Sequence, residues 1–405
     1  MSYQMKGLTL WPLLPNWKRG ITESLEFRTR VIGPTLTGMR QKRRMRIAPR
    51  RTFAFEVHPH HDSRRLLDNL RFAQGKNEWA LPVWHDRQSL TAALPVGSLV
   101  VPCETVGYDF VAGGYAVLRR NKLFTTDFEI VQIDSVEAGS LVLMDETEAA
   151  WDVGTFLYPI RRACLSDNSN NAVLLSGEVS TLSVAFEVLE PCDWSEHTFA
   201  AQYRGRPVWE FKNDWRTQRS FSMSRIISSV DNDTSTPSYF DFPGKTFAGI
   251  DTLWRAKGRA EHSLVRSALY ALAGRYKSLW VSTLANDLQM VGSIGSSSTA
   301  LTVGYCAYAE FNLDREGRRD IRIELWNGTV YYRRVTAATA NGQTEQLTLS
   351  SSLGVSLLAS QVRRISFLML MQQSSDSVTM THHTDANGLS TLPLVFEGVV
   401  EPPSE

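Results

Sequence analysis

Two halves of this 405-residue chain resemble each other in the same order, and this repeat limits the possible folds more than any single motif. The clearest match pairs residues 180–187 (STLSVAFE) with residues 390–397 (STLPLVFE), and both segments are soon followed by Glu-Pro. A repeat of this length indicates that one folding unit occurs twice. We therefore interpret the chain as a structural duplication in which each half buries a core of its own.

Shorter matches elsewhere in the chain are collinear with this one. They pair Asn16-Trp17-Lys18 with Asp214-Trp215-Arg216, Thr52-Phe53-Ala54 with Thr246-Phe247-Ala248, and Arg161-Arg162 with Arg363-Arg364. The spacing changes only where loops could absorb insertions. The repeat divides the chain into an N-terminal arm and first strand (1–50), a first β-sandwich repeat (51–191), a connecting segment with a second arm (192–240) and a second β-sandwich repeat (241–405).

Local patterning predicts one helix and many strands in each repeat. Apolar residues follow helical spacing over 63–73 and again over 264–272, each time ending near a glycine. Most other segments alternate between apolar and polar residues, and Asn327-Gly328 between 321–326 and 330–335 is a strong hairpin signal. We expect a mainly-β or α+β fold, with two tandem β-sandwich domains that are each flanked by one helix.

Composition argues against several functional classes. The chain has 43 Lys and Arg against 42 Asp and Glu, so its net charge of +1 implies no specific nucleic-acid binding. Four widely scattered cysteines form no close pair, which is typical of reduced residues in a protein made inside the cell. The opening residues lack the pattern of a signal peptide, and the most apolar run, 365–371, is too short to span a bilayer. We expect no membrane insertion.

A basic run between residues 40 and 51 admits three interpretations. Its cations alternate with Met45, Ile47 and Phe53, which favours one edge of a half-buried strand that faces solvent or a partner. Phosphate binding and a targeting signal are the alternatives. The run contains Arg40, Lys42, Arg43, Arg44, Arg46, Arg50 and Arg51.

Motifs for metal binding and catalysis are weak. His58, His60 and His61 beside Asp62 are rich in donor atoms, but no second ligand cluster has a recognisable spacing, so we interpret them as turn residues. His382-His383 is expected on a surface loop. No nucleophile elbow, phosphate loop or H-E-x-x-H motif occurs. We predict no enzyme activity, no metal and no cofactor, although two distant carboxylates of a hydrolase would leave no local motif.

Tryptophans are numerous, with eleven in the chain. About half are expected in the cores, because tryptophan buries a large area. Trp11 and Trp17 lie on a Pro-punctuated segment, for which we predict docking onto a neighbouring subunit. The complete predicted interface is Trp11, Pro12, Pro15, Trp17, Arg40, Arg43, Arg44, Arg46, Arg50, Arg51, Trp209 and Trp215.

The first 120 residues carry landmarks of a known group of proteins. These are Trp11-Pro12, Pro15-Asn16-Trp17, Leu25-Glu26-Phe27-Arg28-Thr29, Leu81-Pro82-Val83-Trp84 and Gly107-Tyr108-Asp109. In these motifs the chain resembles tail proteins of long-tailed bacteriophages and prophages, and its opening is similar to that of distal tail proteins, which form a ring at the end of the tail tube. The dense basic run departs from the usual opening of that group.

The resemblance implies a structural virion protein of the tail tip or baseplate, assembled in the cytoplasm of the bacterial host. Its implied partners are further copies of itself, the tail tube protein, the tape-measure protein and other tail-tip or baseplate proteins. Two tail-tube-like units per chain favour a homotrimer with a pseudo-six-fold ring, since 3 × 2 = 6, and a homohexamer is the competing arrangement. A carbohydrate-binding module that stacks host glycans on exposed tryptophans and a cell-wall hydrolase are the alternative functions.

Overall fold

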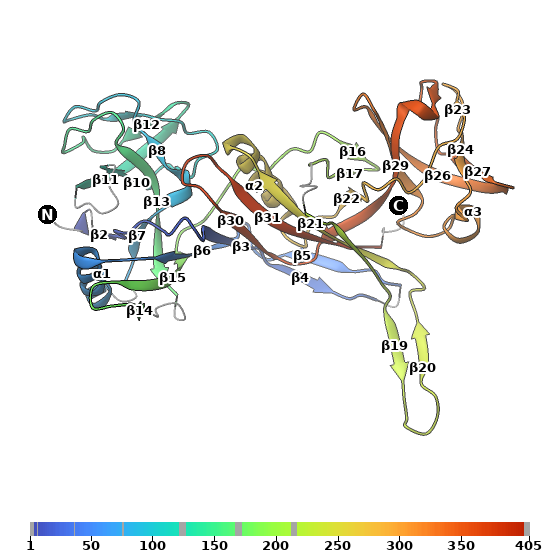
Figure 1. The fold of residues 1–405 in the computed structure, drawn as a ribbon, viewed down its shortest axis with the longest axis horizontal. Coiled ribbons are helices and arrows are strands. Elements are labelled where there is room, and N and C mark those ends of the chain that lie inside the picture. The colour runs from blue at the N-terminus through green and yellow to red at the C-terminus, as the bar shows by residue number, and fades with distance from the viewer. Residues whose placement is uncertain are drawn as a thin grey trace.

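The computed structural model describes residues 4–5, 7–35, 37–74, 77–120, 127–166, 172–211 and 217–400. Strands dominate this part of the chain, which also contains three α-helices, so the prediction of a mainly-β fold is confirmed. Figure 1 shows two bulky ends joined by long strands that cross the middle of the molecule, and a hairpin that projects from it.

The first half contains one long helix among its strands. Before the helix come β1 (Gln4–Met5), β2 (Leu8–Leu10), β3 (Ile21–Glu26), β4 (Thr29–Ile32), β5 (Gln41–Arg44) and β6 (Arg50–Val57). Then follow α1 (His61–Gln74), β7 (Trp79–Pro82), the 3-10 turn η1 (Trp84–Asp86), β8 (Gln88–Ser89), β9 (Val100–Pro102), β10 (Tyr115–Arg119), β11 (Phe128–Glu137), β12 (Ser140–Leu143), β13 (Phe156–Leu165), β14 (Ala172–Leu174) and β15 (Ser180–Val188).

The second half has a similar order of elements. It opens with β16 (Gln202–Tyr203), β17 (Arg206–Pro207), β18 (Ser220–Ser224), β19 (Ile227–Val230), β20 (Ser238–Asp241), β21 (Phe247–Ala256), α2 (Arg259–Leu272), β22 (Leu279–Ser282), β23 (Ser293–Ile294) and β24 (Ala300–Gly304). It closes with α3 (Tyr308–Phe311), β25 (Asp320–Leu325), β26 (Val330–Asn341), β27 (Thr344–Leu349), β28 (Leu357–Leu358), η2 (Ala359–Gln361), β29 (Val362–Gln373), β30 (Ser377–His382) and β31 (Ser390–Gly398).

The pairing of the strands repeats as well as their order. The antiparallel chain of pairs β6–β15–β13–β10–β11–β12–β9 recurs as β21–β31–β29–β25–β26–β27–β24. In each half a 14-residue helix follows the long first strand, and the next strand pairs with β13 or with its counterpart β29. Each half has one apolar core beside its helix and one beneath its outer hairpins, and the second half has a further small cluster around Trp280. The core beside α2 also takes in Leu25 and Phe27 of the first half.

The structural register corrects two of the shorter sequence matches. Phe186 and Phe396 correspond in the clearest match, and they lie opposite Phe53 and Ile250 respectively. The residue that corresponds to Phe53 is therefore Ile250, three positions beyond the predicted Phe247. By the same comparison Arg161-Arg162 of β13 corresponds to Met369-Leu370 of β29 rather than to Arg363-Arg364. Short matches slip easily in strands, where partner pairing and not residue identity sets the register.

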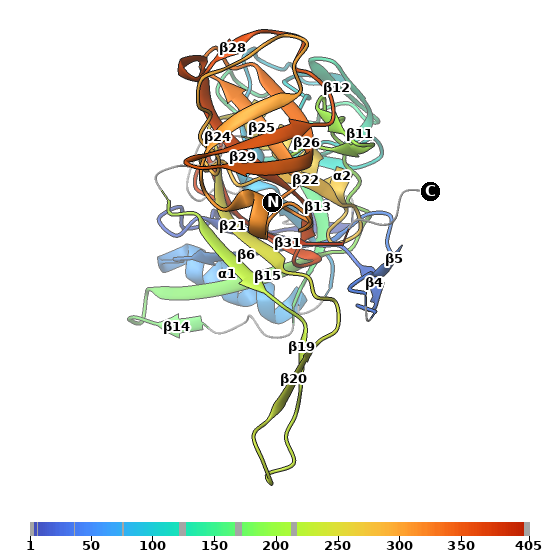
Figure 2. The same cartoon turned by 90° about the vertical axis from the view of Figure 1, so that its right-hand side faces the viewer.

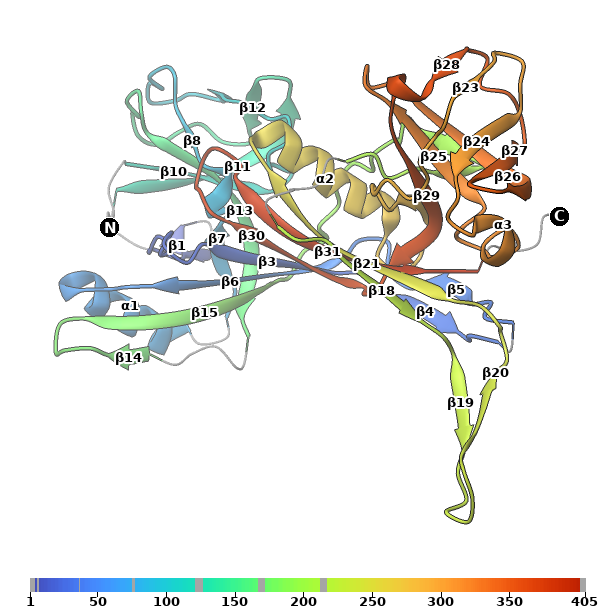
Figure 3. The ribbon, with the colours of Figure 1, turned by 45° about the vertical axis from the view of Figure 1, so that its right-hand side comes forward.

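One continuous antiparallel sheet joins the halves. β3 pairs with β6 on one side and with β30 of the second half on the other. The resulting order is β14–β15–β6–β3–β30–β31–β21–β18, a run of eight strands. Figure 3 shows these strands crossing the molecule from the α1 end to the projecting hairpin. The N-terminal segment is thus not a free arm, because β3 lies at the centre of this sheet.

Candidate functional site: two sheet edges and a buried junction

The predicted docking role of the Trp-Pro segment is wrong for Trp11. β2 pairs in parallel with β7, and the backbone N–H of Trp11 donates to Ala80 at 3.0 Å. This pairing directs Trp11 into the first core, where it is fully buried and its ring lies 5.0 Å from that of Phe186. Pro12 and Pro15 are buried as well, and Trp17 is half-buried against the same core. The segment buries its side chains within its own chain.

Trp209, also predicted at the interface, belongs to the second core. It is 7% exposed, and its ring lies 5.4 Å from that of Phe396. Trp215 falls outside the described residues. Among the described tryptophans only Trp326 is largely exposed, at 68%, so the glycan-stacking alternative retains one residue of this type in that part of the chain.

The basic run does not form one strand. It covers β5, a turn and the start of β6, and most of its charges meet carboxylates of the same chain. Arg40 lies 2.6 Å from Glu397, Arg44 lies 3.6 Å from Glu196, and Arg46 lies 3.5 Å from Glu26. Arg51 is wholly buried, so its assignment to a surface is wrong. Arg43 and Arg50 are exposed, and their contact with a partner stays a prediction.

Both ends of the eight-stranded sheet are open within the described residues. β14 pairs there only with β15, and β18 pairs only with β21. Each edge carries exposed apolar side chains: Val173 (59%) and Leu174 (65%) on β14, and Phe221 (47%) and Met223 (67%) on β18. An exposed edge strand offers unpaired backbone groups to another chain, and proteins usually protect such edges. These two edges are therefore candidate interaction surfaces.

The two open edges correspond to the two strands that meet inside the chain. β18 lies beside β21 as β3 lies beside β6, and β14 lies beside β15 as β30 lies beside β31. Inside the chain β3 and β30 pair with each other over six residue pairs. The molecule thus contains one complete strand junction, formed by β3 and β30. Its two open edges carry the strands that correspond to these two.

The hairpin β19–β20 is a further exposed surface. It projects from the ends of β18 and β21, away from the rest of the molecule (Figure 2). Its large apolar side chains are exposed and consist of Ile227, Val230, Tyr239 and Phe240.

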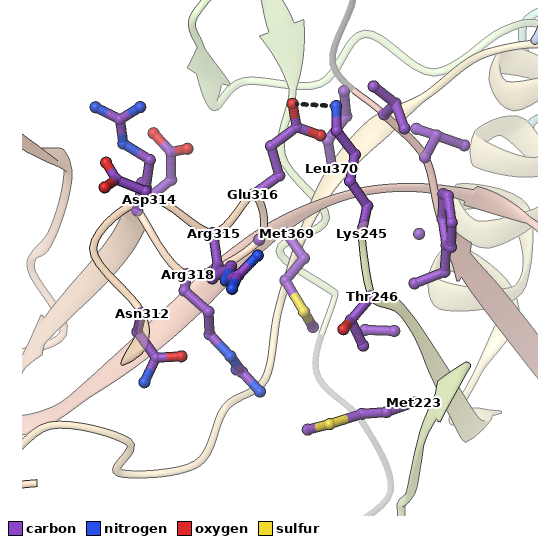
Figure 4. A pocket seen from close by; sticks show the side chains of 18 of the residues that line it. Met223, Lys245, Thr246, Asn312, Asp314, Arg315, Glu316, Arg318, Met369 and Leu370 are labelled. Atoms are coloured by element: carbon purple, nitrogen blue, oxygen red, sulfur yellow. Dashed lines mark hydrogen bonds and ion pairs between the residues drawn. The ribbon is translucent and has the colours of Figure 1, made fainter. Parts of the chain in front are cut away.

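A pocket of about 620 Å³ lies beside the β18 edge. It is lined by Met223 and Thr246 on one side and by the 312–319 loop on the other (Figure 4). Lys245 and Glu316, which both line the pocket, form an ion pair at 3.0 Å. The lining combines apolar side chains with six cations and three carboxylates.

The junction between the halves contains a dense set of buried charges. Arg51 bonds to Glu23 at 2.5 Å and also to Asp109, which in turn accepts from Arg161. From the second half, Arg266 of α2 reaches Glu23 at 3.1 Å. Each of these side chains is at most 3% exposed. Charges removed from water in this way require partners, and here each half supplies partners to the other.

The two central carboxyl groups stay ionised because of these cations. Burial would raise the pKa of Glu23, but the charges of Arg266 and Arg51 and a hydrogen bond from His382 outweigh it and hold the pKa well below its usual value. Burial opposes Arg161 and Arg51 in the same way at Asp109, whose pKa is also lowered.

Three histidines meet next to Glu23: His85 of η1, His262 of α2 and His382 of β30. The expectation that His382 lies on a surface loop is wrong, since it is the last residue of β30 and is 1% exposed. The neighbouring His383 is exposed. Alternation along a strand sends adjacent side chains to opposite faces, which explains their different environments.

Sequence reasoning missed most residues of this junction. One signal was available: Ile21, Glu23 and Leu25 share a strand face, so a carboxylate stands among core residues. The other members lie far apart in the chain, with no local spacing that connects them.

No family model matches the chain, and no curated protein matches it. None of the described helices is long and apolar enough to cross a bilayer.

Proposed function

We propose that this chain is a structural ring protein of a phage tail tip or baseplate, in which three copies close a pseudo-six-fold ring. The observation that carries the proposal is the pair of open edges, which correspond to the joined strands β3 and β30. Repeating that junction between chains would place β18 of one copy against β14 of the next. The eight-stranded run of each copy would then join those of the others, and three copies would contribute 3 × 8 = 24 strands to one closed run with no free edge.

The two similar units of each chain, proposed to be tail-tube-like, are central to this function. A closed wall with pseudo-six-fold symmetry fits a six-fold tube on one side while keeping three-fold symmetry for the tip on the other. The hairpin β19–β20 lies between β18 and β21 as the hairpin β4–β5 lies between β3 and β6, and these hairpins would offer contacts to the tail tube protein or another tip protein. The resemblance of the first 120 residues to tail proteins points to the same setting.

Mass measurement and imaging of the full-length chain test the proposal. At micromolar concentration, alone and with the tail tube protein, we expect a ring of 3 × 45.5 = 136.5 kDa. Cryo-electron microscopy should resolve six similar wall units in this ring. A ring of six chains would favour the homohexamer, and monomer under both conditions would contradict the proposal.

A further inference from the structure

His85, His262 and His382 come from three separate segments and converge at the junction of the halves. One ring nitrogen from each lies within 4.8 Å of the others. The rings of His85 and His382 stack at 3.7 Å, and the ring of His262 lies 5.2 Å from that of His382. All three side chains are 1% exposed.

The hydrogen bonding of these rings is incomplete. Neither ring nitrogen of His85 or of His262 has a hydrogen-bond partner in the structure, although all four atoms are buried. A buried polar atom without a partner costs about 1–3 kcal/mol, and such atoms are uncommon in native cores. An ordinary core histidine would use at least one nitrogen for a bond. Two histidines with all four nitrogens unused point to a missing ligand.

We propose that His85, His262 and His382 form a binding site for a divalent transition-metal ion, with Zn²⁺ as the ion that best fits. Three imidazoles are a frequent donor set for zinc, and neutral imidazole is the form that binds. Burial favours that form here, because it lowers the pKa of His85 and His262 well below the usual value and also lowers that of His382.

Glu23 supplies the orienting carboxylate that such sites commonly have. Its Oε2 lies 2.8 Å from Nε2 of His382, while Arg51 and Arg266 hold its other oxygen. A carboxylate that accepts the second N–H of a ligating histidine fixes the orientation of the ring. Two carboxylate oxygens also lie near Nε2 of His85, that of Glu23 at 3.8 Å and that of Asp86 at 3.5 Å. Both carboxylates are paired with arginines as well, Glu23 with Arg51 and Arg266 and Asp86 with Arg259.

The position of the site suggests its role. His85 belongs to the first half, whereas His262 and His382 belong to the second. An ion bound by all three would fasten the halves at the point where β3 meets β30. The expected effect is stabilisation of the intact chain, since a ligand that binds only the folded state raises its stability. The site lies within one chain and does not depend on ring formation.

Metal analysis of the full-length protein tests the site. Protein expressed with added Zn²⁺ should contain about one equivalent per chain, as expected for a three-histidine site. After treatment with a chelator, Co²⁺ should produce the intense visible absorption of a tetrahedral site, and Zn²⁺ should abolish it. Removal of the metal should lower the melting temperature. Wild-type protein that retains no Zn²⁺ and gives no Co²⁺ spectrum would overturn the proposal, whatever the variants do.

Matched variants locate the ion. His262→Gln combined with His382→Gln should remove the bound equivalent and the metal-dependent shift in melting temperature. The control replaces His58, His60 and His61 with glutamine; all three of these histidines are exposed, and they offer the same number of imidazole donors. The control should keep its metal. Loss of metal from the control, or its retention in a folded H262Q/H382Q variant, would assign the ion elsewhere and refute the site.

Discussion

At the scale of single residues, Arg50 and Arg51 are neighbours with opposite environments. β6 alternates, so Arg50 faces solvent while Arg51 points into the junction and is wholly buried. In this structure Glu23 and Asp109 make burial of Arg51 possible by neutralising it. Residue type alone placed both arginines in one basic surface, whereas strand alternation and the buried carboxylates give them different environments.

Replacing Asp109 should strongly destabilise the chain. Asp109→Asn leaves Arg51 and Arg161 buried without their shared carboxylate, and breaking a buried pair costs about 3–5 kcal/mol. Urea denaturation at neutral pH measures the loss in the free energy of unfolding. Because the pKa of Asp109 is lowered in the folded state, its contribution is present above the unfolded-state pKa and is lost as the pH falls through the folded-state value.

Glu178→Gln is the matched control. Glu178 pairs with Arg65 at 2.8 Å, but both side chains are about half exposed. An exposed pair contributes about 0–1 kcal/mol, so the control should unfold near the wild-type midpoint. Equal losses in the two variants would show that the buried network does not hold the halves together.

At the scale of elements, the two long helices show how contact with the other half of the chain increases burial. α2 lies at the junction and buries nine of its residues, whereas α1, at the free end, buries Ser63 and Leu67. Phe72 of α1 is 95% exposed. The strands show the same contrast as the helices: β3 and β30, which pair with each other, are largely covered, while β18 and β14 are exposed. The uncovered elements are those that the proposed ring would cover.

The register of β3 and β30 predicts a specific disulfide between chains. Thr22 lies opposite Thr381, and their counterparts at the open edges are Ser220 and Val173. Opposite residues in antiparallel strands have Cα atoms about 4.5–5.5 Å apart, which a disulfide can span. Ser220→Cys with Val173→Cys, in a Cys306→Ser background that removes the exposed native thiol, should form covalent oligomers on mild oxidation.

Ser220→Cys with Ser176→Cys tests the register. Ser176 is exposed but lies three residues beyond Val173, which displaces the thiols by about 10 Å in an extended chain. Non-reducing electrophoresis should show efficient crosslinking only for the in-register pair. Similar yields from both pairs, or crosslinks within one chain, would argue against pairing of β18 with β14.

At the scale of the whole molecule, one sheet runs through the chain, and it ends in two different edge strands, β14 and β18. The edges are complementary rather than alike, so copies would join head to tail, and such contacts form a ring only if the rotation closes. The internal junction already sets one step of that rotation. In the proposed ring, two units per chain would make every second step of the rotation covalent, which would reduce the number of chains that must assemble.

Assembly should make thermal stability depend on protein concentration, because association stabilises the folded state by mass action. Phe221→Lys places a charge on the β18 edge, a substitution of the kind that blocks edge pairing. We expect this variant to remain monomeric, with a melting temperature that is independent of concentration, while the wild type melts higher as its concentration rises. A ring of normal mass from the variant would exclude this edge as the interface.

Short-range patterns in the sequence were sufficient to predict the local features of this protein. The helices over 61–74 and 259–272, the hairpin at Asn327-Gly328 and the mainly-β character follow from periodicities and turn residues within short segments. Such patterns express the preferences of neighbouring residues and need no information from distant parts of the chain.

The contacts between distant segments are visible only in the folded chain. β3 pairs with β30 across more than 350 positions, as the Ser24–Thr379 contact at a separation of 355 illustrates. That pairing covers β3, converts Glu23 and Arg51 into buried partners and brings His382 to His85 and His262. Strand register and the compensation of buried charge depend on residues far apart in sequence, and no short-range pattern encodes them.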